Sequence, residues 1–142
     1  MIQRPEQSPG FLLWHVTLRW QRELTAALKP LGLTHVQFVL LATAWWLNTH
    51  EQQPSQVALA TEAGTDVKMA SQVIRTLEQK GLITREPDPT DTRTYRIVVT
   101  DAGTALAPQA IEVVESVDRA LFARLPGRAK RDFTAALSQL RR

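Results

Sequence analysis

Hydrophobic residues recur with helical spacing along most of the chain. In residues 11–31 an apolar side chain stands at every third or fourth position, and Gly32 ends this stretch. Thr34 then begins a second helix, because its spacing to Gln37 matches a capping box. Residues 36–47 of this helix are apolar on nearly every side. Such a helix is expected to lie between other elements, buried on several faces.

Two short helices joined by a glycine-containing turn are predicted next. Pro54 suits the first position of one helix, which Gly64 ends. Asp66 caps the other helix over residues 67–80. The apolar stripe of this second helix consists of Ala70, Val73, Ile74 and Leu77. Its opposite side is polar and rich in hydrogen-bond donors, and consists of Lys68, Ser71, Gln72, Arg75 and Gln79. This arrangement is typical of a helix-turn-helix.

After this pair the hydrophobic period changes from helical to alternating. Residues 82–86 and 93–99 are predicted to form two strands, joined by a proline-rich loop over residues 87–91. The second strand would carry its larger side chains, Tyr95, Ile97 and Val99, on one face. A hairpin in this place is expected to be the wing of a winged helix-turn-helix.

The remaining chain is predicted to be helical. Thr100 caps a long helical region that ends at Pro126, and Pro108 is expected to kink this helix or to delay its regular start. Residues 128–142 form a last, short and basic helix. The order of elements predicts a mainly α fold with a small β-hairpin wing (α+β), organised as a single domain over residues 1–142.

Composition limits the kinds of protein to which the chain can belong. Its 142 residues include 17 Lys and Arg against 14 Asp and Glu, and the net charge of +3 permits a nucleic-acid partner without requiring one. No cysteine is present, which excludes disulfides, thiolate metal sites and cysteine nucleophiles. The three histidines are scattered along the chain, so neither a metal site nor a cofactor is expected.

No apolar stretch approaches the ~20 residues that span a bilayer, and the first residues do not match a signal peptide. We therefore expect a cytoplasmic protein with no membrane partner. Paired carboxylates in an apolar setting, a nucleophile elbow and phosphate-binding glycines do not occur. A protein without enzymatic activity is predicted.

The polar side of the second short helix suits a DNA groove, which is edged by phosphates and base acceptors. Gln72 suits an adenine, and Lys68 or Arg75 suits a guanine or a phosphate. The alternative is a surface that only contacts solvent, because the polar side of most amphipathic helices does no more than that. The preceding helix, the glycine turn and a hairpin that carries arginines together favour DNA.

The hairpin carries the arginines Arg85, Arg93 and Arg96. A basic tip can insert an arginine into the minor groove of DNA, where the field is most negative. Asp91 lies two residues before Arg93, and its carboxylate would orient a neighbouring guanidinium through a bidentate hydrogen bond. We assign Asp91 and Arg85 to orienting the wing. A hairpin loop whose aspartate and arginine are merely solvated remains the alternative.

Three segments resemble the signature region of the MarR family, the multiple-antibiotic-resistance regulators. They are residues 80–85 (KGLITR), 87–93 (PDPTDTR) and 99–103 (VTDAG). Residues 12–41 are similar to the first two helices of that family, so the resemblance covers essentially the whole chain. It implies a homodimer, with dimerisation helices over residues 9–31 and 101–142 and a winged DNA-binding region over residues 34–100.

The resemblance also implies which residues contact double-stranded DNA. The recognition positions of the family map onto Val67, Lys68, Met69, Ser71 and Gln72, and its wing arginine maps onto Arg93. The full predicted contact set also includes residues at the start of the first short helix. It consists of Ser55, Gln56, Val67, Lys68, Met69, Ser71, Gln72, Arg75, Arg93 and Arg96. Members often carry arginine at the position of Gln72 and Ser or Thr at Lys68 or Met69. The operator sequence is therefore not inherited from relatives. Arg96 replaces a common apolar residue, so the resemblance implies no role for it.

In the family, repression is usually relieved by a small aromatic or anionic effector that enters between the dimerisation helices and the winged region. The residues proposed for such a pocket are Trp14, His15, Arg19, His35 and Trp45, with Trp46 as a further candidate. The alternative is that these tryptophans pack in the core or in the dimer interface. The chain is thus predicted to repress transcription at a pseudo-palindromic operator. Two other functions compete with this one. The winged helix could contact a partner protein, or the protein could bind DNA without sequence specificity.

Overall fold

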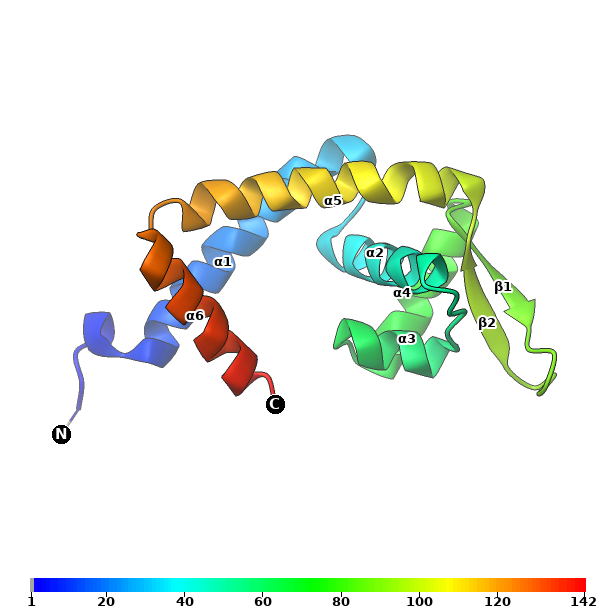
Figure 1. Ribbon diagram of the computed structural model, residues 1–142, viewed down its shortest axis with the longest axis horizontal. Coiled ribbons are helices and arrows are strands. Elements are labelled where there is room, and N and C mark those ends of the chain that lie inside the picture. The colour runs from blue at the N-terminus through cyan, green and yellow to red at the C-terminus, as the bar shows by residue number, and fades with distance from the viewer. Residues whose placement is uncertain (1) are drawn as a thin grey trace.

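The computed structural model describes residues 2–142, which form an arch (Figure 1). Along these residues the α-helices and strands are α1 (Pro9–Leu28), α2 (His35–Thr49), α3 (Gln56–Ala63), α4 (Val67–Gln79), β1 (Ile83–Pro87), β2 (Tyr95–Val99), α5 (Asp101–Phe122) and α6 (Gly127–Leu140). Short 3-10 helices at Pro5–Gln7 and Lys29–Leu31 flank α1. The predicted fold class, mainly α with a small β-hairpin wing, is confirmed.

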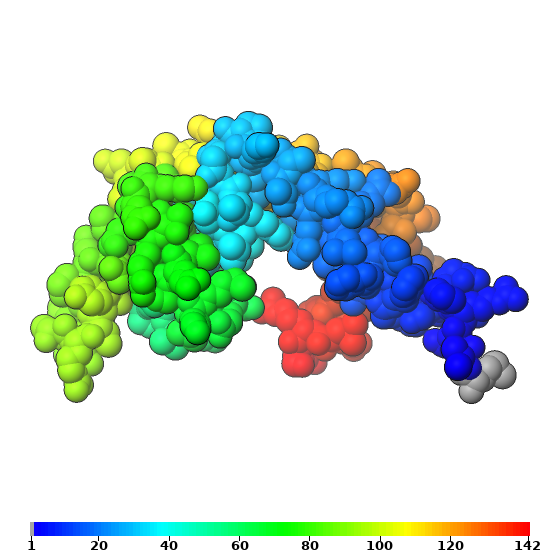
Figure 2. Space-filling view, turned by 180° about the vertical axis from the view of Figure 1, so that it is seen from behind, coloured from blue at the N-terminus to red at the C-terminus, as the bar shows by residue number. Residues whose placement is uncertain are grey.

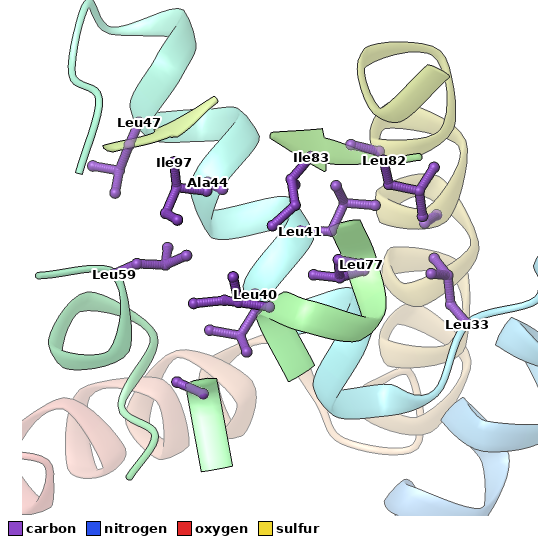
Figure 3. Packing of buried hydrophobic residues seen from close by; sticks show 14 of the residues in the cluster. Leu33, Leu40, Leu41, Ala44, Leu47, Leu59, Leu77, Leu82, Ile83 and Ile97 are labelled. Atoms are coloured by element: carbon purple, nitrogen blue, oxygen red, sulfur yellow. The ribbon is translucent and has the colours of Figure 1, made fainter. Parts of the chain in front are cut away.

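The hydrophobic core surrounds α2, as its apolar sequence predicted. This helix buries Leu40, Leu41, Ala44 and Leu47. Side chains from α3, α4 and both strands join the same cluster, and Figure 3 shows them gathered around α2. Their largest members are Leu59, Ile74, Leu77, Ile83 and Ile97, all almost completely buried. The core therefore holds the helix-turn-helix and the wing together as one unit.

Helix α5 joins the two parts of the arch, which are the unit packed around α2 and the end formed by α1 and α6. Its first half adds Ala107 and Ala110 to the core around α2, whereas its second half packs beside α1, where Asp118 accepts a hydrogen bond from Trp20. The boundary expected at residue 100 therefore does not separate two packing units. Figure 1 shows α5 running along the top of the arch, from the wing to α6.

The helix start expected at Pro54 is wrong, and the delay that Pro108 was expected to cause at the start of α5 does not occur. Pro54 does not begin α3, because Ser55 is the N-cap of that helix and the Pro54 carbonyl accepts a hydrogen bond from the Ile97 backbone N–H at 2.8 Å. Pro108 does not delay α5, which begins at Asp101 and continues through the proline. Thr104, whose carbonyl oxygen loses its helical partner, is exposed, so water can satisfy that oxygen.

Several predicted boundaries also move. β2 begins at Tyr95 and not at residue 93, because residues 93 and 94 belong to the loop. The strands pair antiparallel, from Ile83 opposite Val99 to Pro87 opposite Tyr95. The α-helical part of the first segment ends at Leu28, after which the chain tightens into a 3-10 helix. The last helix ends at residue 140 rather than 142.

Apolar side chains remain exposed at the end of the arch away from the wing. On α1 and α6 they are Phe11, Leu12, Leu13, Trp14, Val16, Leu137 and Leu140. An apolar hollow of about 200 Å³ lies among α1, α5 and α6 beside them. Figure 2 shows the arch from behind, with α1 (blue) on the side opposite the wing. Exposed apolar side chains gathered at one end of a molecule indicate an interaction site.

Residues 2–142 contain neither a single membrane-spanning helix nor a metal-binding cluster. No single helix there combines the length and the apolar character needed to cross a membrane, and α1 with α2 meets that condition only as a pair bent by 71°. In the same residues, no three His, Cys, Asp or Glu side chains are placed to hold a metal ion together.

Candidate nucleic-acid interface

The turn between α3 and α4 sets up the helix-turn-helix. Gly64 closes α3 in the left-handed conformation, with a φ of 74°, which glycine adopts without strain. Asp66 then caps α4, because its carboxylate accepts a hydrogen bond from the Met69 backbone N–H at 3.1 Å. Ser55 caps α3 in the same way, accepting from the Ala58 N–H at 3.1 Å.

Helix α4 divides into an apolar and a polar side, as the sequence predicted. Ala70, Ile74 and Leu77 are buried in the core. The exposed residues are Val67, Lys68, Met69, Gln72, Arg75 and Gln79, and Ser71 is half-buried among them. In Figure 2, α4 (green) lies on the near face beside the wing. The helix therefore presents amide and cationic groups to whatever binds outside.

The wing tip is organised by two aspartates. Asp88 Oδ1 accepts hydrogen bonds from the Thr90 hydroxyl at 2.7 Å and from its backbone N–H at 2.8 Å. These bonds lower the pKa of the Asp88 carboxyl. Asp91 Oδ1 accepts from both the backbone N–H and the Nε of Arg93, each at 3.1 Å. The Arg93 side chain is nevertheless 89% exposed, so it is oriented and still accessible.

Arg85 ties the wing to α4. Its Nη2 and Nε donate to the two carboxylate oxygens of Glu78 at 3.2 and 3.3 Å. Its guanidinium also lies 5.6 Å from the centre of the Tyr95 ring, a cation–π contact. The contacts of Arg85 with Glu78 and Tyr95 were not predicted from the sequence. The available signal was the opposite charges of Glu78 and Arg85, which lie on either side of the turn at Gly81.

Arg96 lies at the base of the wing rather than at its tip. It pairs with Glu86 across the hairpin and forms an isolated β-bridge with Ser55. The side chain is half-buried, and its Nε has no hydrogen-bond partner among the described residues. The structure thus brings Ser55 and Arg96 together where the wing meets α3, apart from Arg93 at the tip.

Comparison with known proteins identifies the family. Residues 33–95 match the model of the MarR family. YdcH of Bacillus subtilis, described as an uncharacterized HTH-type transcriptional regulator, is 40% identical over 96% of this chain and 91% of its own length. The chain belongs to the MarR family. The resemblance seen in the sequence is thereby confirmed, and this MarR-family protein is a helix-turn-helix transcriptional regulator.

Other similar proteins also cover more than nine tenths of the chain. The HTH-type transcriptional repressor Rv2887 of Mycobacterium tuberculosis is 34% identical over 92% of this chain and 91% of its own length. Its structure in complex with salicylic acid has a TM-score of 0.71 and 32% identity over 94% of this chain and 96% of that one. CouR from Rhodococcus jostii RHA1, bound to p-coumaroyl-CoA, has a TM-score of 0.83 and 26% identity over 98% and 95%.

Three of the residues predicted for a MarR-type effector lie on α1. Trp14 and His15 are exposed near its start. Arg19 binds Glu23 at 2.9 Å and lines a hollow of about 410 Å³ between α1 and α5, to which neither Trp14 nor His15 contributes. The structure therefore does not bring these three side chains into one hollow, and an anion at Arg19 would compete with Glu23.

The other two lie on α2, in different surroundings. Trp45 packs half-buried against the hydrophobic core, which fits the packing alternative. His35 stands at the start of α2 with its ring 5.1 Å from the ring of Trp20. Trp20 Nε1 in turn donates to Asp118 of α5 at 2.8 Å. His35 therefore lies where α1, α2 and α5 meet, the place at which the two parts of the arch join.

Burial makes the stability of this junction depend on pH. It lowers the pKa of His35 below 6.5, although the Asp118 carboxylate acts in the opposite direction. At a pH between the pKa of His35 in the folded protein and its value of 6.5 in the unfolded chain, the folded protein therefore binds fewer protons than the unfolded chain. The contribution of neutral His35 is complete above pH 6.5 and is lost as the pH falls through the folded-state pKa.

We expect the urea midpoint to fall between about pH 7.5 and about pH 5.5, and to fall less in His35→Gln. The glutamine keeps a polar side chain of similar size but does not titrate in this range. Unfolding curves at a fixed protein concentration measure both midpoints, because oligomer stability varies with concentration. The same pH dependence in the two proteins would contradict the assignment to His35.

Proposed function

We propose that the protein is a homodimeric repressor that binds a pseudo-palindromic operator and releases it when a small aromatic or anionic ligand binds. One observation supports this above all. The polar side of α4 and the wing-tip Arg93 are both exposed, and their amide and cationic donors suit base edges and phosphates. The proposal places the protein in the cytoplasm with the DNA that it regulates, and gives it no catalytic role.

The second subunit is proposed from the apolar side chains exposed on α1 and α6. Packing them against a twofold-related copy would remove them from water. The two α4 helices would then enter successive major grooves, about 34 Å apart, one turn of the duplex. We propose residues 34–100 as the DNA-binding region. We assign dimerisation to α1, the second half of α5 and α6.

The ligand class is proposed from the relatives. Rv2887 has been seen with salicylic acid and CouR with p-coumaroyl-CoA, and each of these molecules combines an aromatic ring with an anionic group. A ligand of this class would relieve repression only if it bound the DNA-free state more tightly than the operator-bound state.

The test of DNA recognition begins with an enrichment of duplexes from a random pool, which is expected to yield an inverted repeat. Arg93→Ala should weaken binding to that operator about tenfold, whatever the base sequence, and lower the salt slope by about two units, because the dimer loses one phosphate contact in each subunit. Gln72→Ala should instead lose about 1–3 kcal/mol of preference at one base pair in each half-site. Titrations of labelled duplexes at several salt concentrations measure both effects.

Gln109→Ala, on an exposed position of α5, is the matched control and should bind like the parent. Parental binding by Arg93→Ala and Gln72→Ala as well would show that the contact assignment is wrong. Duplex binding without an enriched motif would point to a non-specific DNA-binding protein. Absence of duplex binding at low salt would point to a protein partner for the α4 surface.

A further inference from the structure

One lysine joins the end of α4 to the turn between α1 and α2. Lys80 directly follows α4 as its C-cap residue. Its Nζ donates to the backbone carbonyl oxygen of Gly32 at 2.6 Å and to Oε1 of Gln37 at 2.8 Å. These acceptors lie 48 and 43 residues away in the sequence. We call this set of contacts the Lys80 clamp.

Both acceptors of the Lys80 clamp are themselves held in place. Gln37 Oε1 also accepts the Thr34 backbone N–H at 3.2 Å, as one half of the capping box that begins α2. Gly32, with a φ of 72°, closes the 3-10 helix that follows α1. None of the ion pairs formed within residues 2–142 includes Lys80. Its ammonium instead makes charge-assisted hydrogen bonds to two fixed neutral oxygens.

Helix α5 holds the same end of α4 through the residues that follow Lys80. The Thr100 hydroxyl donates to the Gly81 carbonyl at 2.6 Å, and the Thr100 backbone N–H donates to the Leu82 carbonyl at 3.0 Å. The C-terminal end of α4 is therefore fixed to the α1–α2 turn and to the start of α5. Its N-terminal end carries the exposed Lys68 and Met69 outward.

Fixing one end of a helix determines where its other end lies. α4 has 13 residues and so a length of about 20 Å. A rotation of about 10° about its clamped end would move its N-terminal end by about 3 Å, which is close to the rise of one base pair. In a dimer, the separation of the two recognition helices determines the half-site spacing that the protein prefers.

We propose that Lys80 is a positioning residue, which holds α4 at a fixed angle to the dimerisation helices and so makes the dimer select one half-site spacing. This inference rests on the proposed function, because half-site spacing has a meaning only for a dimer on an operator. The Lys80 ammonium is bound to protein oxygens. Its loss should therefore change spacing selectivity without changing the number of phosphates contacted.

The first test compares three variants on the enriched operator and on versions with one base pair added or removed between the half-sites. Lys80→Met, which removes the donors but keeps the length, should lose about tenfold of the discrimination between spacings at an unchanged salt slope. Lys80→Arg, which keeps a cationic donor, should discriminate between the spacings as the parent does. Lys68→Met, the matched control on the exposed side, should lower the slope by about two units, one for each subunit, and keep the spacing preference. Parental spacing preference in Lys80→Met, or a lowered slope like that of Lys68→Met, would overturn the proposal.

A second test needs no DNA. Because the chain has no cysteine, Gln72→Cys provides one spin-labelling site on the exposed side of α4 in each subunit. Pulsed EPR should show a broader distance distribution between the two labels when Lys80→Met is added. Gln37→Met, which removes one acceptor of the clamp, should broaden it in the same way and replaces Lys80→Met if that variant does not fold. An unchanged distribution would overturn the proposal.

Different results would refute the proposed function and the role of the Lys80 clamp. A parent dimer that enriches no operator would refute the proposed function, while the labels would still test the Lys80 clamp. A parent that enriches an operator but shows no effect of Lys80→Met in either measurement would refute the clamp alone. A parent that stays monomeric would refute both.

Discussion

Gly103→Ala is expected to destabilise the protein by about 3 kcal/mol, although alanine ordinarily favours a helix over glycine by about 1 kcal/mol. A Cβ at this position would overlap the Leu82 carbonyl oxygen and lie 2.6 Å from Cγ1 of Val99. The carbonyl is a backbone atom that already accepts the Thr100 N–H, so it cannot move without losing that bond. Overpacking therefore outweighs helix propensity at this residue.

Gly10→Ala is the matched control, because a Cβ there meets no atom within 4 Å. The same added methyl group should leave stability unchanged or raise it by up to about 1 kcal/mol, since Gly10 lies in α1. Urea unfolding of both variants at one protein concentration measures the difference. A urea midpoint of Gly103→Ala equal to or above that of the parent would show that Gly103 does not pack tightly against the Leu82 carbonyl.

Much of this fold could be predicted because its signals are local. The apolar residues of α2 occur all around the helix, and a helix of that kind must be surrounded by other elements. Gly64 and Asp66 end one helix and begin the next by short-range chemistry, which made the helix-turn-helix visible. Asp91 and Arg93 are two residues apart, so their hydrogen bonds could be expected from spacing alone.

The features that were missed depend on contacts between distant segments. Pro54 looked like a helix start, but its carbonyl pairs with Ile97, 43 positions later, in a strand whose position the sequence does not reveal. Lys80 looked like one more basic residue at a helix end, and its partners lie at the α1–α2 turn. Aromatic residues predicted for a ligand pocket could not be separated from packing residues, because both need the same spacing on a helix.

Leu13→Glu is expected to dissociate the proposed dimer and to abolish tight binding of the full operator. Leu13 is 49% exposed and lines the apolar hollow among α1, α5 and α6, whose other lining residues are uncharged. A carboxylate buried there against a second subunit would have no cationic partner, at a cost of about 3 kcal/mol or more. Twofold symmetry places two such groups in each dimer, so the cost is about 6 kcal/mol and the dimer dissociation constant should rise about 10⁴-fold.

Val57→Glu is the matched control, because Val57 is equally apolar and exposed but lies on α3, away from α1 and α6. Sedimentation across a range of protein concentrations should find a monomer for Leu13→Glu and a dimer for Val57→Glu and the parent. The monomer should still bind one half-site weakly, because α4 and the wing fold around α2 and not around the hollow lined by Leu13. A Leu13→Glu protein that remained a dimer would show that the subunits associate through another surface. The arrangement of α4 helices proposed for the operator would then be wrong as well, since it follows from pairing through α1 and α6.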